Sequence, residues 1–186
     1  MRKVLFSVTG MIGLPDLAAR VIRAVGEPDK RLAEDHLRAL RAVRFAARTG
    51  FAIAEGTYAA IARHAAAVAS VSAERIADEM RKLLGGPRPG DGVRLMADTG
   101  LLASLLPELP AEATREVAAG ALDRLATPNG EARWVVGWAL LLWPLGEAGA
   151  AGVMTRLRHS RRMIDDVAAT VGIGHALATM DPGDAA

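Results

Sequence analysis

The sequence is organised around one stretch, Glu34-Asp35-His36-Leu37-Arg38-Ala39-Leu40-Arg41-Ala42-Val43-Arg44-Phe45-Ala46-Ala47-Arg48. At about 100° per residue, its spacing predicts a helix with four arginines inside an arc of roughly 120°, namely Arg38, Arg41, Arg44 and Arg48. Much of the remaining surface is apolar and predicts a seam formed by Ala39, Leu40, Ala42, Val43, Ala46 and Ala47. Such a helix can pack against a core and still present a row of guanidinium groups.

The arginine row has two interpretations. Guanidinium groups on a rigid helix suit phosphate, because each offers forked donors and a permanent charge. Asp35 lies one turn before Arg38, is expected to pair with it, and adds an acceptor, so the pattern also suits a base edge that both donates and accepts. Arginines at this spacing are more often the solvated face of an amphipathic helix, with Asp35 and Arg38 as a surface ion pair.

Composition favours an all-α fold. Hydrophobic residues make up 51% of the 186 residues and aromatic residues only 4%, while Ala and Leu are abundant, as is typical of helical domains. The chain has no cysteine, which excludes disulfides and makes a reducing cytoplasm the expected location. The apolar segment from Trp134 to Leu145 is too short to cross a bilayer, so we expect a buried helix there and no membrane partner.

The charges are distributed unevenly, although the net charge is only +2. Residues 1–50 hold ten Lys and Arg against five Asp and Glu, whereas residues 101–155 hold three against six. A basic N-terminal part favours an anionic partner, and nucleic acid is one candidate. A second basic cluster is compatible with contact to an RNA backbone, although a solvated helix junction is the commoner explanation; it comprises Arg156, Arg158, Arg161 and Arg162.

Turn and cap residues predict a succession of short helices. A short extended lead-in is expected at residues 4–8, and helices besides the central one are expected over residues 17–24, 58–67, 73–84, 93–98, 101–105, 111–126, 132–142, 148–157 and 161–171. An extended connector is expected at residues 51–53. The caps expected are Pro28 at a first helical position, Gly50 as a left-handed C-cap, and Thr57, Ser72 and Ser160 as N-caps. The Gly- and Pro-rich residues 85–92 are predicted to be a linker between two helical lobes.

The sequence contains no motif that indicates catalysis. It has no P-loop, and its four histidines, His36, His64, His159 and His175, are scattered without metal-ligand spacing. Asp165 and Asp166 are adjacent on a predicted helix, where they point about 100° apart and cannot easily share one metal ion. We therefore predict neither catalytic residues nor a metal site in this chain.

Several segments, in this order, resemble the tRNA nucleotidyltransferase/poly(A) polymerase family, specifically the bacterial CCA-adding type. The resemblance covers roughly residues 12–110, and its most specific part is the Glu-Asp-x-x-Arg-x-x-Arg-x-x-Arg helix. The other matching segments are Asp16-Leu17, Ile22-Arg23-Ala24-Val25-Gly26-Glu27-Pro28, Gly50-Phe51, Ser72-Ala73-Glu74-Arg75-Ile76 with Glu79, Gly100-Leu101-Leu102 and Leu106-Pro107-Glu108-Leu109.

The resemblance implies that this helix is the neck, whose motif acts as an amino-acid template for incoming CTP or ATP. Asp35 and Arg38 would pair with the Watson–Crick edge of the nucleotide. Arg41 and Arg44 would support the nucleotide and its phosphates, while Glu34, which would position Arg38, and Arg48 would have supporting roles. The region from about Gly56 onward resembles the body, which in the family holds the acceptor and TΨC arms of tRNA.

On the same resemblance, the chain is divided into four parts. Residues 1–11 are an extended remnant of a head–neck junction, residues 12–84 the neck with the base-recognition helix, residues 85–92 the linker, and residues 93–186 the RNA-binding body and tail. The family's catalytic head, with its Gly-Ser loop and Asp-x-Asp metal ligands, is expected before residue 12. Because Mg²⁺-dependent phosphoryl transfer depends on those carboxylates, we expect this chain to be inactive without a head domain.

Several alternatives stay open at this point. The chain is a truncation, half of a split enzyme or a decayed fragment, and C-adding, A-adding, full CCA-adding and poly(A) activities all fit this part of the sequence. The rival function is a non-enzymatic helical RNA-binding module. That rival predicts that Arg38, Arg41 and Arg44 act as interchangeable charges and that Asp35 has no role.

Overall fold

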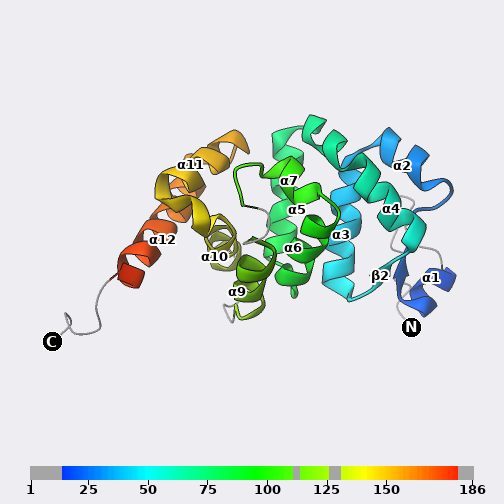
Figure 1. Ribbon diagram of the computed structural model, residues 1–186, viewed down its shortest axis with the longest axis horizontal. Coiled ribbons are helices and arrows are strands. Elements are labelled where there is room, and N and C mark those ends of the chain that lie inside the picture. Colours follow the sequence, from blue (N-terminus) through cyan, green and yellow to red (C-terminus); the bar gives the residue numbers. More distant parts are fainter. Residues whose placement is uncertain (1–13, 111–113, 126–130, 180–186) are drawn as a thin grey trace.

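The computed structural model describes residues 14–110, 114–125 and 131–179. These residues are mostly helical, which confirms the all-α prediction (Figure 1). The helices are α1 (Leu14–Ala19), α2 (Pro28–Glu34), α3 (Leu37–Thr49), α4 (Glu55–His64), α5 (Ala73–Leu84), α6 (Pro89–Asp98), α7 (Leu101–Leu105), α9 (Ala119–Asp123), α10 (Glu131–Leu142), α11 (Gly146–Arg156) and α12 (Arg161–Thr179). Shorter 3₁₀ or π turns are η1 (Ala65–Ser70), η2 (Thr114–Ala118) and η3 (Trp143–Leu145). The lead-in expected at residues 4–8 lies outside the described residues.

Two short strands, β1 (Val21–Ile22) and β2 (Ala52–Ile53), pair in parallel near the N-terminal end of the molecule. The N–H of Ala52 donates to the carbonyl of Arg20 at 3.1 Å, and the N–H of Ala54 donates to that of Ile22 at 2.9 Å. The helix predicted over residues 17–24 is therefore wrong in its second half. The β-branched pair Val21–Ile22 takes the extended form because a partner strand is available, whereas the extended connector at 51–53 is confirmed.

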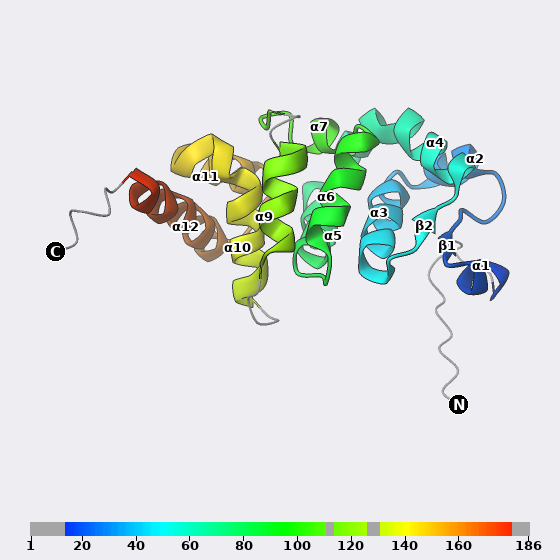
Figure 2. The same cartoon turned by 60° about the horizontal axis from the view of Figure 1, so that its bottom comes forward.

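Helix α3 lies between the end of the molecule that holds α2 and α4 and the central helices α5 and α6, and it packs against α5 and α6 (Figure 2). The predicted apolar seam is confirmed, since all six of its residues are at most 4% exposed. The helix ends at Gly50, which has φ 72° and takes the predicted left-handed C-cap. Pro28 also stands, as predicted, at the first position of its helix.

Two predicted features of the chain's middle differ in detail. Helix α4 begins at Glu55, so Thr57 is not its N-cap; its hydroxyl instead accepts a hydrogen bond from the N–H of Ala24 at 3.0 Å, which joins α4 to the segment after β1. Helix α6 begins at Pro89, so only the first part of the predicted linker is a connection, and α6 packs against both α3 and α9.

The apolar segment in the C-terminal part consists of two helices with a bend between them. By length and composition, residues Ala132–Arg156 would suffice to cross a membrane as one helix. The run bends at Gly146, which has φ 67°, and α11 then packs along α12 (Figure 1). Trp138, Leu141 and Leu142 are fully buried, so the prediction of a buried helix is confirmed.

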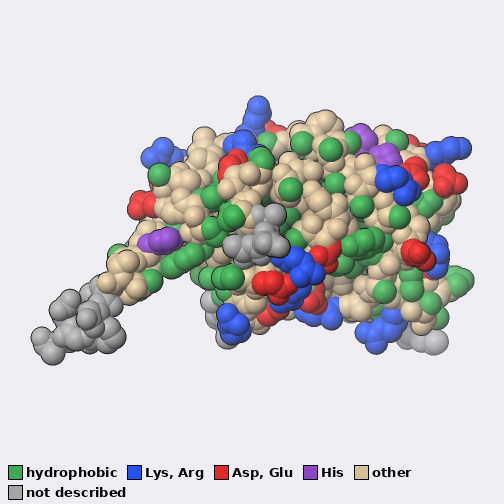
Figure 3. Space-filling view, viewed as in Figure 1, with side chains coloured by type: hydrophobic (Ala, Val, Ile, Leu, Met, Phe, Trp, Pro, Cys, Tyr) green, Lys and Arg blue, Asp and Glu red, His purple; other side chains and the backbone are tan. Residues whose placement is uncertain are grey.

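The helices form an elongated row, with α2 and α4 at one end and α11 and α12 at the other (Figures 1 and 2). A single apolar core runs through the row from Ile22 to Val171. On the face shown in Figure 3, acidic side chains lie beside many of the basic ones. Ion pairs join different elements of the row: Arg94 pairs with Asp123 at 2.7 Å, and Arg115 pairs with Asp98 at 2.7 Å.

Candidate functional site

The predicted continuous helix is broken at Asp35. Helix α2 ends at Glu34, Asp35 is extended with φ −155° and ψ 101°, and α3 starts at Leu37. The carboxylate of Asp35 accepts a hydrogen bond from the N–H of Leu37 at 3.2 Å. This local bond competes with helix continuation, as short acidic side chains often do. The expectation that Asp35 and Arg38 lie one turn apart on one helix is therefore wrong.

The partner of Asp35 is Arg75 of α5, whose guanidinium nitrogen lies 2.9 Å from the carboxylate. Burial raises the pKa of Asp35, but the hydrogen bonds from Arg75 and from the N–H of Leu37 lower it by more, so the pKa lies below its ordinary value. Asp35 is thus an ionised acceptor at neutral pH. Its side chain is 24% exposed and remains within reach of a ligand.

Arg38 is held by α2 rather than by Asp35. Its Nη1 donates to the carboxylate of Glu34 at 2.6 Å and to the carbonyl oxygen of Arg31 at 2.8 Å. Arg38 Nε is buried and has no hydrogen-bond partner. These contacts fix the direction of the guanidinium, and they provide the support that Glu34 was expected to give to Arg38.

Arg41 and Arg44 share one buried acid, Glu79 of α5. Arg41 Nε lies 3.2 Å from one carboxylate oxygen and Arg44 Nε lies 2.6 Å from the other. The side chain of Glu79 is only 2% exposed, and Arg44 lies over the ring of Phe45 at 4.1 Å. The prediction of a solvated arginine face is therefore wrong for Arg44, which is largely buried.

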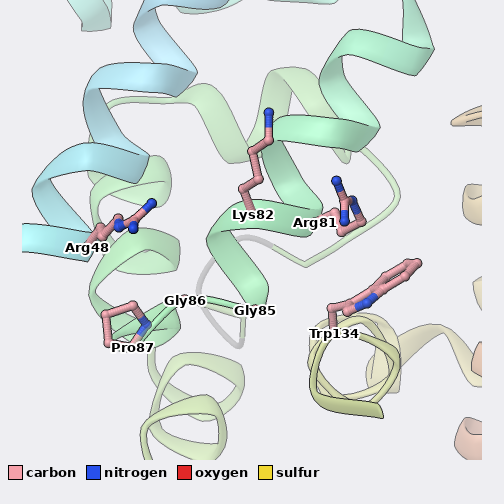
Figure 4. Close-up of a pocket in the computed structure, with 7 residues that line it drawn as sticks. All are labelled: Arg48, Arg81, Lys82, Gly85, Gly86, Pro87 and Trp134. Atoms are coloured by element: carbon pink, nitrogen blue, oxygen red, sulfur yellow. The ribbon is translucent and has the colours of Figure 1, made fainter. Parts of the chain in front are cut away.

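Arg48 differs from the other arginines of the row. Its side chain makes no hydrogen bond or ion pair with the residues that the structure describes, and it lines a groove near the C-terminal ends of α3 and α5 (Figure 4). The four arginines thus have three different environments. Their shared helical arc does not make them equivalent.

The second basic cluster is also paired. Arg156 holds Glu108 with two contacts of 2.8 and 2.9 Å and donates to the carbonyl of Leu105 at 3.1 Å. Arg158 lies 2.9 Å from Glu74, in an ion pair whose partners are both mostly exposed. Two further pairs lie along the exposed start of α12, namely Arg161 with Asp165 and Arg162 with Asp166.

Sequence reasoning assigned no role to Arg75 and Glu79, which hold Asp35 and two arginines. A signal was present, because the two residues are four apart on one predicted helix and therefore share a face. Their partners lie 35 to 40 residues earlier, and helical periodicity does not say which helices are neighbours. The tertiary packing of α3 against α5 was needed to assign them.

The described residues do not fit a magnesium ion. No group of three or more His, Asp or Glu side chains converges among them. Asp165 and Asp166 are each paired with an arginine of α12. What the site offers instead is one ionised acceptor, Asp35, beside guanidinium donors whose directions are fixed by Glu34 and Glu79.

Comparison with known proteins first defines the class. Residues 50–112 match the family described as "Probable RNA and SrmB- binding site of polymerase A". This match extends from the end of α3 through α7 and includes both Arg75 and Glu79. About a third of the chain, from the end of α3 through α7, is therefore similar to this family.

More specifically, the chain is a homologue of the CCA-adding enzymes and corresponds to their RNA-binding neck and body region. It is 38% identical over 157 residues to the CCA-adding enzyme of Geobacillus stearothermophilus, a match that covers 84% of this chain and 38% of that protein. It is 37% identical over 166 residues to the CCA-adding enzyme of Lactiplantibacillus plantarum, a match that covers 86% of this chain and 39% of that protein. The chain thus spans about two fifths of the length of these relatives.

Solved structures agree with this assignment. The crystal structure of the Bacillus stearothermophilus CCA-adding enzyme in complex with CTP superposes with a TM-score of 0.76 at 34% identity, over 92% of this chain and 41% of that chain. The Thermotoga maritima CCA-adding enzyme, complexed with tRNA, has a TM-score of 0.70 at 21% identity, over 89% of this chain and 42% of that chain. The second similarity concerns the fold alone.

Proposed function

We propose that this chain is the neck and body part of a cytoplasmic tRNA nucleotidyltransferase. In this proposal Asp35 and Arg38 select CTP or ATP by pairing with the base, and the helices from α4 onward dock tRNA for addition of its 3′-CCA end. The observation that carries the proposal is that an acceptor, Asp35, and a donor, Arg38, lie close together in the sequence at the start of α3, each held by a different residue. Asp35 is ionised and partly exposed, and Arg38 stands three residues later with its guanidinium held by Glu34.

The supporting contacts favour a template over a simple basic surface. A base edge is recognised by donors and acceptors in fixed directions, whereas a phosphate backbone needs mainly positive charge. The side chains proposed to form the template are each held by an ion pair. Arg75 holds Asp35, Glu34 holds Arg38, and Glu79 holds both Arg41 and Arg44. Arginines that are held so differently are not interchangeable charges.

The part played by this chain is binding and orientation. Asp35 accepts from the base, Arg38 donates to it, and Arg41 and Arg44 support the nucleotide and its phosphates. Nucleotide transfer in this proposal requires a nucleotidyltransferase head domain, whose carboxylates bind Mg²⁺ and supply the metal-ion chemistry. In this proposal the neck comprises residues 12–84 and the body and tail begin with α6 at Pro89, with residues 85–88 as the connection and residues 1–11 as the head–neck junction.

The second basic cluster is proposed as an additional contact to the RNA backbone. Exposed ion pairs contribute little to stability, so Arg158, Arg161 and Arg162 can exchange a carboxylate for a phosphate at small cost. Arg156 is held more firmly, because it also donates to the carbonyl of Leu105.

Mixing the chain with a separately produced head domain tests the proposal. With CTP, ATP, Mg²⁺ and tRNA that lacks its 3′ end, we expect nucleotide addition. Asp35→Ala and Arg38→Ala should alter the ratio of C to A incorporation far more than the affinity for tRNA. Asp29→Ala is the matched control, because Asp29 is an exposed acid of α2 that pairs with Arg63, and it should leave both properties unchanged.

Absence of addition, with association of the two parts demonstrated, would contradict the proposal. The non-enzymatic RNA-binding module predicts another set of results. If it is right, Asp35→Ala has no effect, and glutamine substitutions of Arg38, Arg41 and Arg44 weaken RNA binding equally. The affinity would then fall steeply with salt, because backbone contacts release counterions.

A further inference from the structure

A groove of about 640 Å³ lies between the C-terminal ends of α3 and α5 and the start of α10 (Figure 4). Arg48 of α3 and Lys82 of α5 stand on one part of its wall, while Arg81 and Trp134 stand together on another. Gly85 and Gly86 also line it, so there the wall is main chain without side chains. The groove is therefore lined by three cationic side chains, one aromatic ring and the main chain of two glycines.

The groove continues the seam that carries the template residues. Helices α3 and α5 pair in the same order along their lengths, with Asp35 against Arg75 and Arg44 against Glu79. Arg48 lies ten residues after Arg38, which at 1.5 Å per residue is about 15 Å along the helix. A ligand that extends from the template along this seam arrives at Arg48.

The charges of the groove favour a ligand with phosphates. Arg48 has no hydrogen-bond or ion-pair partner among the described residues, although it ends a helix whose other arginines are held by acids. Arg81 and Lys82 both pair with one exposed carboxylate, Asp78. Lys82 also lies 3.7 Å from the buried Glu79. Exchange of an exposed carboxylate for a phosphate costs little in water, so these cations can bind a ligand without disrupting the core.

Trp134 adds a feature that a purely electrostatic surface does not need. Its ring is partly buried against the core, and the guanidinium of Arg81 lies 5.8 Å from the ring centroid. An aromatic ring among cations is the arrangement on which single-stranded nucleic acids stack their bases. In a duplex the bases are already stacked and paired, so a duplex offers Trp134 no free base.

We propose that this groove binds a single-stranded RNA segment, with its phosphates on Arg48 and Lys82 and one base stacked on Trp134. The inference rests on the proposed function as an RNA-binding neck and body, and it adds the path of an unpaired strand past the template helix. In this arrangement Arg48 is a phosphate-binding residue at the end of the seam. This role replaces the supporting role in nucleotide binding that the resemblance implied for Arg48.

The test measures binding of a fluorescein-labelled 12-nucleotide single-stranded RNA to the full chain by anisotropy at several salt concentrations. Arg48→Gln and Lys82→Gln should each weaken binding about three- to tenfold and lower the slope of log affinity against log salt by about 0.7. Trp134→Leu should weaken binding about tenfold, whereas Trp134→Phe keeps a stacking face and should bind nearly as the wild type does. Lys30→Gln, at an exposed cation of α2 that makes no ion pair with the residues the structure describes, is the matched control and should have no effect.

Each other outcome has a defined meaning. Wild-type affinity in Arg48→Gln, Lys82→Gln and Trp134→Leu would overturn the groove proposal, and so would an equal loss by Trp134→Leu for a duplex of the same sequence. If Arg48→Gln weakens binding of free CTP, the groove binds the nucleoside triphosphate, and the proposal of a single-stranded RNA site is overturned. If the wild type binds tRNA but the groove variants behave normally, only this inference fails. If the wild type binds no RNA, the proposed RNA-binding function fails as well.

Discussion

Glu79 shows how single residues organise the arginine row. Its carboxylate is buried, and each of its two oxygens accepts from a different guanidinium, at 3.2 Å from Arg41 and 2.6 Å from Arg44. A buried charge is costly unless it is paired, so each of these three residues depends on the other two. Glu79 is therefore a positioning residue for two of the four arginines.

Glu79→Ala should destabilise the fold strongly, by about 3 kcal/mol, because it leaves the largely buried Arg44 without its counter-charge. Glu79→Gln keeps an acceptor and should cost less. Urea unfolding measures both free energies. Asp78→Ala, on the same helix but at an exposed pair, is the control and should cost less than about 1 kcal/mol. Equal losses for Asp78→Ala and Glu79→Ala would contradict this account of Glu79.

Asp35→Asn tests the contribution of the Asp35 charge through the pH dependence of stability. The folded state holds the pKa of Asp35 below its ordinary value of 3.8, because the hydrogen bonds from Arg75 and Leu37 outweigh the opposing effect of burial. A lowered pKa means that the stabilisation is complete above about pH 5 and is lost as the pH falls through the folded-state pKa. The difference in free energy of unfolding between wild type and Asp35→Asn should be constant from pH 7 to 5 and shrink below pH 4. A difference that does not shrink in acid would show that the charge of Asp35 is not stabilised in this way.

At the scale of elements, helix packing brings distant charged residues together. The neighbours α3 and α5 place Arg41, Arg44 and Glu79 at their shared seam, and α6 packs against both α3 and α9. The contact between α6 and α9 is close at Gly90, where a Cβ atom would stand 2.5 Å from the carbonyl oxygen of Ala119 and 2.1 Å from the Asp123 carboxylate. Helices α6 and α9 are thus in close contact at Gly90.

Gly90→Ala should therefore destabilise the molecule by about 1–3 kcal/mol, because main-chain atoms of α9 must move to admit the methyl group. Gly152→Ala is the matched control within α11, since nothing lies within 4 Å of the position that its Cβ would take. That substitution should raise stability by about 0.5–1 kcal/mol, as alanine favours a helix interior over glycine. Thermal or urea unfolding of both variants checks the sign of each change. Stabilisation by Gly90→Ala would contradict the close packing of α6 and α9.

At the scale of the whole molecule, the elongated row of helices has one core. The buried apolar residues run without interruption from the strand pair at Ile22 to Val171 of α12. Helix α10 packs against α5 as well as α12, so contacts cross the predicted linker. The neck and the body are therefore parts of one packed unit in this structure.

We expect this unit to unfold in one cooperative transition. All three tryptophans lie between residues 134 and 143, so their fluorescence reports on the C-terminal half, whereas far-UV circular dichroism reports on all helices. The two urea unfolding curves should coincide, as two-state unfolding requires. Separate midpoints would contradict the prediction and indicate independent lobes. A broad transition without a clear midpoint would favour a decayed fragment.

Much of the fold was predictable because helical signals are local. The apolar seam of α3, the extent of α5 and α7, the C-cap at Gly50 and the buried α10 all follow from patterns within one turn or one helix. Two of the misassigned segments depend on partners that are distant in the sequence. Val21–Ile22 forms a strand because residues 52–53 offer it a partner, and Thr57 is a packing contact because Ala24 lies beside it.

The sequence by itself determined the helical class, the α3 helix with its arginines and apolar seam, and the resemblance to CCA-adding enzymes, because residue type and spacing are local properties. Only the tertiary structure decided that Arg75 holds Asp35 and that Glu79 holds both Arg41 and Arg44. The partners of Asp35, Arg41 and Arg44 stand 35 to 40 residues away on α5, and helical periodicity is the same whichever neighbour a helix has. The packing of α3 against α5 turned one row of arginines into residues with distinct environments.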